Sequence, residues 1–319
     1  MQRGPQPALV QLRAAQLPDF GDDADLASLR QAIARTQPAW RKRGDDAAAA
    51  SASRLLGALA AGGDAAARRR AIAGAFRVLQ VRDPILMTAY YEPELAARVR
   101  PDARFRYPLY ARPPDLTPSS APVRAAIDAG ALAGRGLELA WTDDPLGLFL
   151  LHVQGSGRLR FPDGTVRPAL FAGTNEKPYK ALARVLIEHG HLTRAEATVP
   201  GIRRVMATLP ADEQRALMQE NPRYVFFKLG AAPGDPVGSM GVPLTAGRSI
   251  ATDPTLVPSG RIAYLVTPSA RRFVVAQDVG AAIKGAHVDL FVGPGEDAEA
   301  FAGSARDRGT LYLLEPVAQ

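Results

Sequence analysis

The sequence predicts a mainly β protein with helices at its N-terminus, an α+β fold. Glycine (29) and proline (27) are frequent among the 319 residues, which favours turns and short strands over a long helical bundle. Apolar residues at helical spacing occur in the first eighty residues and again between about 178 and 219. From Pro84 onward, short apolar runs otherwise alternate with turn residues, as they do in strands.

Three helices are expected before Pro84. Asp22 and Asp23 are expected to cap the first helix, and an alanine-rich helix follows at about 45–61. Asp64 is expected to cap the third helix. The third helix is expected to present apolar residues at helical spacing to the core: Ile72, Phe76 and Leu79.

The region from Pro84 to about 175 is predicted to be largely β. Pro162-Asp163-Gly164 is a strong hairpin turn between two of its strands. The expected strands are Ile85–Pro93, Arg104–Tyr110, Leu137–Thr142, Leu146–Val153, Arg158–Phe161 and Thr165–Leu170.

Helices are expected to return at Pro178–His189 and at about 211–219, before a second group of strands. Thr193 and Glu196, between these helices, have the spacing of a capping box. The remaining expected strands are Arg223–Leu229, 242–250, 261–267, 271–277 and Thr310–Glu315.

The composition limits the chemistry and the partners. The formal net charge of +7 favours acidic polymers, but the charge is spread along the chain, so we do not expect nucleic acid as a partner. The absence of cysteine excludes disulfides and thiolate chemistry, and none of the four histidines has zinc-site spacing. We therefore expect no metal and no cofactor.

The N-terminal residues carry no apolar core of a secretion signal, and no stretch is apolar enough to span a bilayer. The sequence also contains no cysteine that could be lipidated. It leaves two readings open, a cytoplasmic protein or a chain whose targeting segment is missing.

Three aspartates are the candidate catalytic residues. Asp278 follows the apolar run Phe273–Ala276, and Asp289 begins another apolar stretch eleven residues later. Asp253 has a similar strand-to-turn setting upstream. Carboxylates held close together disfavour each other's ionisation, which prepares a general acid at neutral pH. One such aspartate alone would indicate only a turn, but three in this glycine-rich stretch favour a site.

Two further motifs have side chains suited to binding a polar ligand. Thr88, Tyr90 and Tyr91 place a hydroxyl and aromatic rings at the end of an expected strand, and such rings stack on sugars. Core packing is the simpler reading of each one alone. The second motif is a glycine-rich turn that would let a flat ligand approach the backbone: Gln154, Gly155, Ser156 and Gly157.

An ordered set of motifs from about Pro84 to the end resembles the membrane-bound lytic murein transglycosylase A family. The aspartates Asp253, Asp278 and Asp289 match those of its three-aspartate domain. Ala89 and Ala281 stand where the family usually has glycine. The matching segments are Thr88–Pro93, Tyr107–Tyr110, Val153–Gly157, Phe171–Asn175, Asn221–Phe227, Val242–Ser249 and Asp278–Asp289.

The resemblance implies a double-psi β-barrel built from two chain segments. Residues 1–93 and 221–319 would form the barrel with the N-terminal helices, and residues 94–220 would form an inserted β-rich domain. A groove between the two domains would hold the glycan.

The resemblance also implies the reaction. The family cleaves the β-1,4 bond between N-acetylmuramic acid and N-acetylglucosamine without water and leaves a 1,6-anhydro end. Asp289 would act first as acid and then as base, while Asp278 and Asp253 would support it. Lys284 would meet a carboxylate of the substrate, although a surface lysine is the simpler reading.

Two alternatives stay open. One is a hydrolase with Asp289 as acid and Asp278 as base, and the other is a glycan-binding barrel without catalysis. The resemblance implies a periplasmic, outer-membrane-associated protein that acts on peptidoglycan. We further expect a monomer that meets other cell-wall remodelling proteins.

Overall fold

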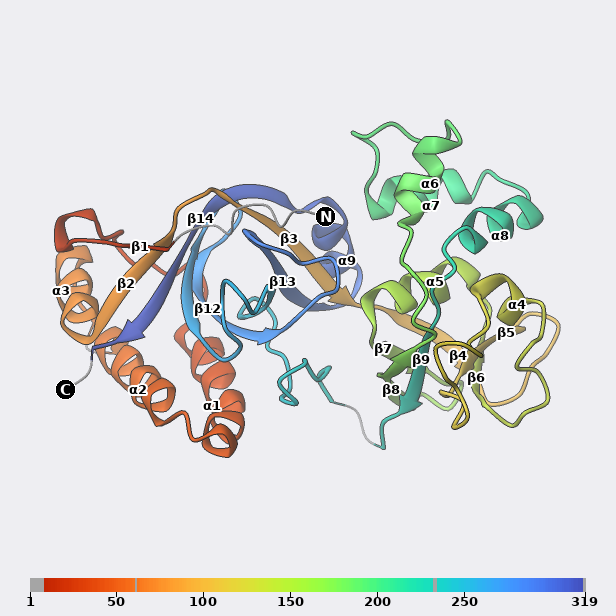
Figure 1. Cartoon of the computed structure of the whole chain (residues 1–319), viewed down its shortest axis with the longest axis horizontal. Helices are drawn as coiled ribbons and strands as arrows, with labels where there is room; N and C mark the ends of the chain where they lie inside the picture. The colour runs from red at the N-terminus through yellow and green to blue at the C-terminus, as the bar shows by residue number, and fades with distance from the viewer. Residues whose placement is uncertain (1–8, 61, 232–233, 318–319) are drawn as a thin grey trace. The chain divides into compact units, whose positions relative to one another are not determined.

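The chain folds into two compact units, and each has its own β-sheet (Figure 1). This computed structural model describes residues 9–60, 62–231 and 234–317. The first unit contains the chain up to residue 90 together with residues 237–293 and the part from residue 305 onward. The second unit contains residues 91–236 and 294–304.

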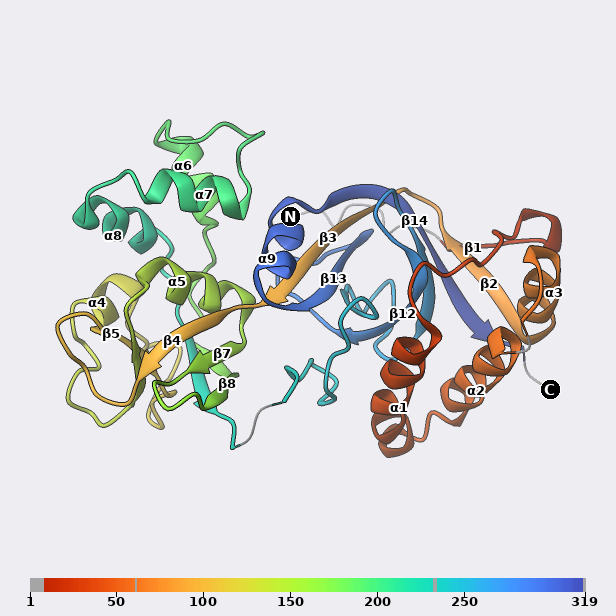
Figure 2. The ribbon, with the colours of Figure 1, turned by 180° about the vertical axis from the view of Figure 1, so that it is seen from behind.

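The first unit holds the N-terminal helices and a large sheet, whose strands come from both ends of the chain (Figure 2). Its elements are β1 (Leu9–Gln11), η1 (Ala14–Gln16), α1 (Leu26–Arg43), α2 (Asp46–Ala60), α3 (Ala65–Ala75), β2 (Phe76–Val81), β3 (Ile85–Glu92), β10 (Ser249–Thr252), β11 (Ile262–Val266), β12 (Arg271–Asp278), β13 (His287–Pro294) and β14 (Arg306–Pro316).

Six strands of this sheet close into a ring. The order of pairing is β14, β11, β12, β10, β13 and β3, and β3 pairs again with β14. β14 can serve both ends because it is long: its residue Arg306 lies opposite Thr88 of β3, while Tyr312 lies opposite Tyr264 of β11. A closed ring leaves no unpaired edge among these six strands, so it is a small barrel.

The N-terminal helices cover an apolar face of the barrel. Asp25 caps α1 by accepting a hydrogen bond from the backbone N–H of Ser28 at 2.7 Å, and Gly44 ends the helix in the left-handed region. Trp40 of α1 is buried and donates its ring N–H to the carbonyl of Gly260 at 3.1 Å. The shared core contains residues from α1 to α3 and from the barrel: Leu29, Ile33, Leu55, Ile72, Tyr264 and Phe273.

The second unit combines a six-stranded sheet with short helices. The sheet order is β5, β6, β4, β7, β8 and β9. Its elements are β4 (Glu94–Arg98), β5 (Tyr107–Tyr110), α4 (Arg124–Asp128), β6 (Glu138–Thr142), α5 (Pro145–Gln154), β7 (Gly157–Arg160), β8 (Val166–Thr174), α6 (Leu182–Glu188), α7 (Val199–Met206), α8 (Ala211–Gln219), β9 (Val225–Leu229) and α9 (Glu296–Ser304).

The expected strand over Leu146–Val153 is wrong, because this segment is the helix α5. Asp144 caps the helix by accepting from the N–H of Gly147 at 2.8 Å, and Pro145 occupies its first turn. Gly155 ends it in the left-handed region. A short apolar run that is buried on several sides has no period that separates a helix from a strand, so the caps decide here.

Two expectations for the N-terminal helices are also wrong. The third helix ends at Ala75, and the following residues form β2, which pairs with β14 and β1. Local spacing could not reveal these partners. The cap of α1 is Asp25, whereas Asp22 forms an ion pair with the buried Arg248 at 2.7 Å.

The prediction of a mainly β chain with N-terminal helices is confirmed. The double-psi crossing of the barrel connections stays a prediction, as do the domain boundaries after residue 93 and before residue 221. In the structure, β9 lies beyond the second boundary and pairs with β8 of the second unit. Among the residues that the structure describes, no helix has the length and hydropathy to cross a membrane.

Candidate active site

Asp278 and Asp289 lie level with each other in the barrel of the first unit. Both residues pair with Ala251 of β10, Asp278 from β12 on one side and Asp289 from β13 on the other. β3 lies next to β13 and carries Thr88 and Tyr90, which are two residues apart and therefore point to the same face of the strand. The barrel thus gathers side chains that lie up to 201 residues apart in the chain.

Asp289 is half-buried and has one hydroxyl partner. The Thr88 hydroxyl donates to Asp289 Oδ1 at 2.6 Å, and the Thr88 oxygen lies 2.9 Å from His287 Nε2. Burial, opposed by the Thr88 hydrogen bond and assisted by the charge of Asp278, raises the pKa of Asp289 to about 6. A carboxyl group with this pKa holds its proton in mildly acidic solution and can act as a general acid.

Asp278 accepts three hydrogen bonds. The backbone N–H groups of Ser239 and Val279 donate to its Oδ1 at 2.8 and 2.9 Å, and the Tyr90 hydroxyl donates to its Oδ2 at 3.1 Å. Burial raises the pKa of Asp278, but all three hydrogen bonds act in the opposite direction. Burial is the larger effect, so the pKa of Asp278 is raised overall, and the three donors limit this rise by favouring the ionised form.

The two carboxyl groups therefore have different surroundings. Asp278 is held by three donors and Asp289 by one hydroxyl. Burial and the negative charges of Asp278 and Asp289 raise the pKa of Tyr90 well above its usual value. Both aspartates therefore act electrostatically on the Tyr90 hydroxyl. In a pair with such different environments, one carboxyl group can keep its proton and act as an acid while the other is charged. Here Asp289 is the candidate for the acid.

Asp253 braces the loop that leads into β13. Its Oδ2 accepts from the N–H of Gly285 at 2.8 Å, and its Oδ1 accepts from the N–H and hydroxyl of Thr255 at 3.0 and 2.7 Å. The Gly285 hydrogen bond is the main reason that the pKa of Asp253 lies below its usual value. Lys284 is exposed in the same loop, and its charge contributes to this lowering. Asp253 thus fixes the approach of the chain to Asp289.

The other site candidates belong to the second unit. Gln154 ends α5, Gly155 caps it with φ of 81°, and Ser156 leads into β7. Close packing requires glycine at position 157, because a Cβ there would lie 2.2 Å from a Leu151 methyl group. The Tyr91 side chain is buried, and this burial raises its pKa to about 12. A role of Tyr91 in substrate binding stays a prediction.

Sequence reasoning did not single out Phe171 as a binding residue. Its ring is 54% exposed on β8, next to a bulge in the pairing with β9. A Cβ at Gly155 would lie 3.9 Å from this ring, so the ring borders the glycine-rich turn. Phe171 lies within one of the matching family segments, which was the signal available, but only the structure reveals its exposure.

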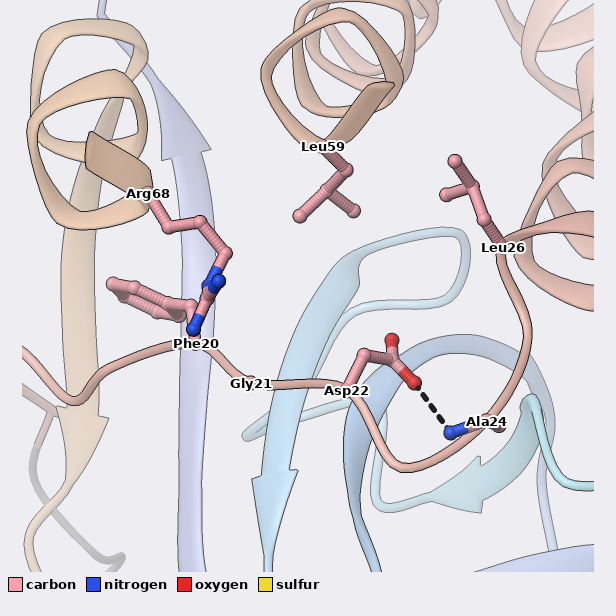
Figure 3. Close-up of a pocket in the computed structure, with 7 residues that line it drawn as sticks. All are labelled: Phe20, Gly21, Asp22, Ala24, Leu26, Leu59 and Arg68. Atoms are coloured by element: carbon pink, nitrogen blue, oxygen red, sulfur yellow. Dashed lines mark hydrogen bonds between the residues drawn. The ribbon is translucent and has the colours of Figure 1, made fainter. Parts of the chain in front are cut away.

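A pocket of about 310 Å³ is lined by residues from the N-terminal part of the first unit and does not include Asp253, Asp278 or Asp289. Figure 3 shows that the Asp22 carboxylate points to the backbone N–H of Ala24, at 3.0 Å. Arg68 donates to the carbonyls of Asp19 and Gly63, so the charged groups of this pocket already have partners. Within the described residues, no three histidine or acidic side chains come together as metal ligands would.

Comparisons with known families match most of the chain. Residues 86–228 match the "MltA specific insert domain" and residues 248–315 match the "3D domain". The membrane-bound lytic murein transglycosylase A of Vibrio cholerae is 35% identical over 243 residues, which are 72% of this chain. The match spans 65% of that relative's length.

Solved structures are similar over nearly the whole chain. Escherichia coli MltA with bound chitohexaose has a TM-score of 0.84 and 26% identity, covering 98% of this chain and 95% of that one. The lytic transglycosylase LtgG of Burkholderia pseudomallei has a TM-score of 0.64 and 36% identity, covering 98% and 97%. The similarity thus extends to the N-terminal helices, which the family models do not cover.

Proposed function

The chain belongs to the membrane-bound lytic murein transglycosylase A family, and from this premise we propose that it cleaves peptidoglycan glycan strands. The bond broken is the β-1,4 bond between N-acetylmuramic acid and N-acetylglucosamine, and the product carries a 1,6-anhydro end. The observation that supports this most is the half-buried Asp289, whose pKa of about 6 suits an acid that must begin protonated.

In the proposed reaction, Asp289 donates its proton to the glycosidic oxygen as the bond from that oxygen to the anomeric carbon breaks. Positive charge develops at the anomeric carbon. The 6-hydroxyl of the same sugar then forms a bond to this carbon and gives its proton to the Asp289 carboxylate. Asp289 thereby regains its proton, and no water is consumed. Hydrolytic glycosidases commonly need two carboxyl groups, whereas here the substrate supplies the nucleophile.

The other two aspartates have supporting roles in this proposal. Asp278, which accepts from three donors, supplies a negative charge that helps to keep the proton on Asp289 until it is transferred. Asp253 fixes the loop before β13 through Gly285. Tyr90 contacts residues of both neighbouring strands: its hydroxyl donates to Asp278 of β12, and the centroid of its ring lies 5.3 Å from that of Phe291 in β13.

Residues of the second unit are proposed to bind the glycan. The exposed ring of Phe171 beside Gly155 offers a face for stacking on a sugar, and Gln154 and Ser156 offer polar groups next to it. Lys284 is an exposed cation that can meet a carboxylate of the stem peptide. We propose a periplasmic location at the outer membrane, and action as a monomer with other wall-remodelling proteins.

Mass spectrometry of the muropeptides released from purified peptidoglycan tests the function. We expect anhydro ends from the wild type, and a loss of at least a hundredfold in their release with Asp289→Asn. Asp163→Asn is the matched control, because Asp163 is exposed in a hairpin turn and should leave the release unchanged.

Other products would contradict the proposal. Reducing ends would mean that water is the acceptor, with Asp278 as the base. Binding to peptidoglycan without any release would indicate a glycan-binding barrel.

A further inference from the structure

We propose that His287 is a positioning residue which, through the Thr88 hydroxyl, keeps the catalytic proton on Asp289; this inference rests on the proposed function. The Thr88 hydroxyl contacts both of the other side chains. Thr88 Oγ1 lies 2.6 Å from Asp289 Oδ1 and 2.9 Å from His287 Nε2. His287 and Asp289 are two residues apart on β13 and therefore share a face of the strand.

A threonine hydroxyl has one hydrogen and can accept through its lone pairs. It can donate to Asp289 or to His287, but not to both at once. Each contact is short enough for a hydrogen bond, so one neighbour must donate to the Thr88 oxygen while the other accepts from it.

The state of His287 decides which arrangement is favoured. Burial, together with the charge of Arg306, lowers the pKa of His287, which favours the neutral ring with one N–H. The backbone of Ala282 opposes this lowering, which is the effect that a nearby carbonyl has on a ring N–H. Since Nε2 faces Thr88, the nitrogen left for Ala282 is Nδ1.

With its hydrogen on Nδ1, the ring offers Nε2 as an acceptor. Thr88 then donates to His287, and its oxygen is free to accept the hydrogen of a protonated Asp289. In this arrangement Thr88 accepts the hydrogen of Asp289, and His287 accepts the hydrogen of Thr88. When Asp289 is ionised, the Thr88 hydrogen turns to the carboxylate and the bond to Nε2 is lost. The bond between Thr88 and His287 therefore favours the acid form of Asp289.

Among the described residues, the titratable groups that act on these three side chains come from β12, β3 and β14. Asp278 on β12 raises the pKa of Asp289, and Tyr90 on β3 lies close to both aspartates. Arg306 on β14 acts on His287 and keeps its ring neutral. β10, between the two aspartates, contributes Ala251 at this level and no titratable group. None of these groups replaces the acceptor that Nε2 provides.

The pH dependence of kcat/KM for muropeptide release tests the proposal. Because Asp289 must be protonated to act, kcat/KM falls above its pKa. His287→Phe removes the acceptor, so this alkaline limb should move down by about half to one pH unit, the equivalent of one neutral hydrogen bond. His287→Gln places an amide oxygen near the position of Nε2 and should leave the limb close to that of the wild type. His191→Phe, on the second unit, is the matched control.

The route through Thr88 is tested by a double-mutant cycle. In a Thr88→Val background the hydroxyl is absent, so His287→Phe should no longer move the limb. Thr88→Ser keeps the hydroxyl and should keep the shift. An unchanged limb in His287→Phe, or an equal shift in the Val background, would overturn the proposal, whereas lower activity at every pH without a shift would indicate a role in packing only.

A measurement without turnover separates this proposal from the proposed function. The ¹⁵N chemical shifts of the His287 ring near pH 6 report its tautomer in the wild-type protein. We expect the hydrogen on Nδ1, and a hydrogen on Nε2 would overturn the proposal whether or not the protein cleaves peptidoglycan. A wild type that releases no anhydro-muropeptides would refute the proposed function, while the tautomer would still decide the arrangement of the three side chains.

Discussion

Replacing Asp278 by asparagine removes a negative charge beside Asp289 while keeping the size of the side chain. The asparagine oxygen can still accept from the N–H groups of Ser239 and Val279, and the Tyr90 hydroxyl can turn to accept from the new amide. The local structure should therefore survive. The change isolates the electrostatic contribution of Asp278 to the pKa of Asp289.

The size of this contribution follows from the strand spacing. Asp278 and Asp289 flank Ala251 on either side of β10, so they are two strand spacings, roughly 10 Å, apart. Two unit charges at this distance interact by about 0.4 kcal/mol in water and by about 1.7 kcal/mol at an effective dielectric constant of 20. These energies correspond to a change of about 0.3 to 1.2 units in the pKa of Asp289.

A negative neighbour raises the pKa of Asp289, so its removal lowers that pKa. The alkaline limb of kcat/KM, expected near pH 6 in the wild type from the pKa of Asp289, should move down by about 0.3 to 1.2 pH units in Asp278→Asn. Below the limb, at about pH 4.5, activity should remain within roughly tenfold of the wild type.

The assay is the rate of anhydro-muropeptide release between pH 4 and pH 8, with Asp163→Asn as a control for loss of a distant aspartate. A fall of several orders of magnitude at every pH would refute the reasoning, because Asp278 would then be a reacting group. A limb that does not move would show that its charge does not reach Asp289.

Three further predictions concern stability. Asp289→Asn should stabilise the protein by up to about 3 kcal/mol at pH 7 and by little at pH 4. The reason is that the pKa of Asp289, raised to about 6 in the folded protein, makes the wild type lose stability as Asp289 ionises. Equal melting temperatures of the two proteins at pH 7 would contradict this. Asp253→Ala should speed amide exchange at Gly285 and lower the unfolding free energy by about 1.5–3 kcal/mol, and unchanged exchange would exclude the brace. Gly157→Ala should cost about 1–3 kcal/mol in denaturant unfolding, since its Cβ would meet Leu151 at 2.2 Å; wild-type stability would mean that the packing relaxes freely.

The sequence predicted those features that depend on short-range chemistry. Alternation, caps and turn residues located β3, β11, β12, α2 and α8, because local propensity and burial agree in these segments. The three aspartates were found in the same way, since each one lies where an apolar run meets glycines or proline. The family resemblance then supplied the reaction, which no spacing in the chain could have provided.

Local patterns were insufficient where a partner far along the chain decides the conformation. β2 was predicted as helix because its pairing with β14 and β1 is invisible to spacing, and α5 was predicted as strand because its apolar run is buried on several sides. The error at β2 comes from tertiary pairing that overrides a weak local preference, whereas the error at α5 comes from overlooking the local caps at Asp144 and Gly155.

The sequence by itself therefore determined that three aspartates could form a site in a mainly β chain, and the tertiary structure decided which groups surround each carboxylate. Only the barrel brings Thr88 to Asp289 and Tyr90 to Asp278, across 201 and 188 residues of chain. The number of donors around each carboxylate, and its burial, set its pKa. The donors around each carboxylate and its burial depend on which strands pair, and the order of residues along one strand does not specify this pairing.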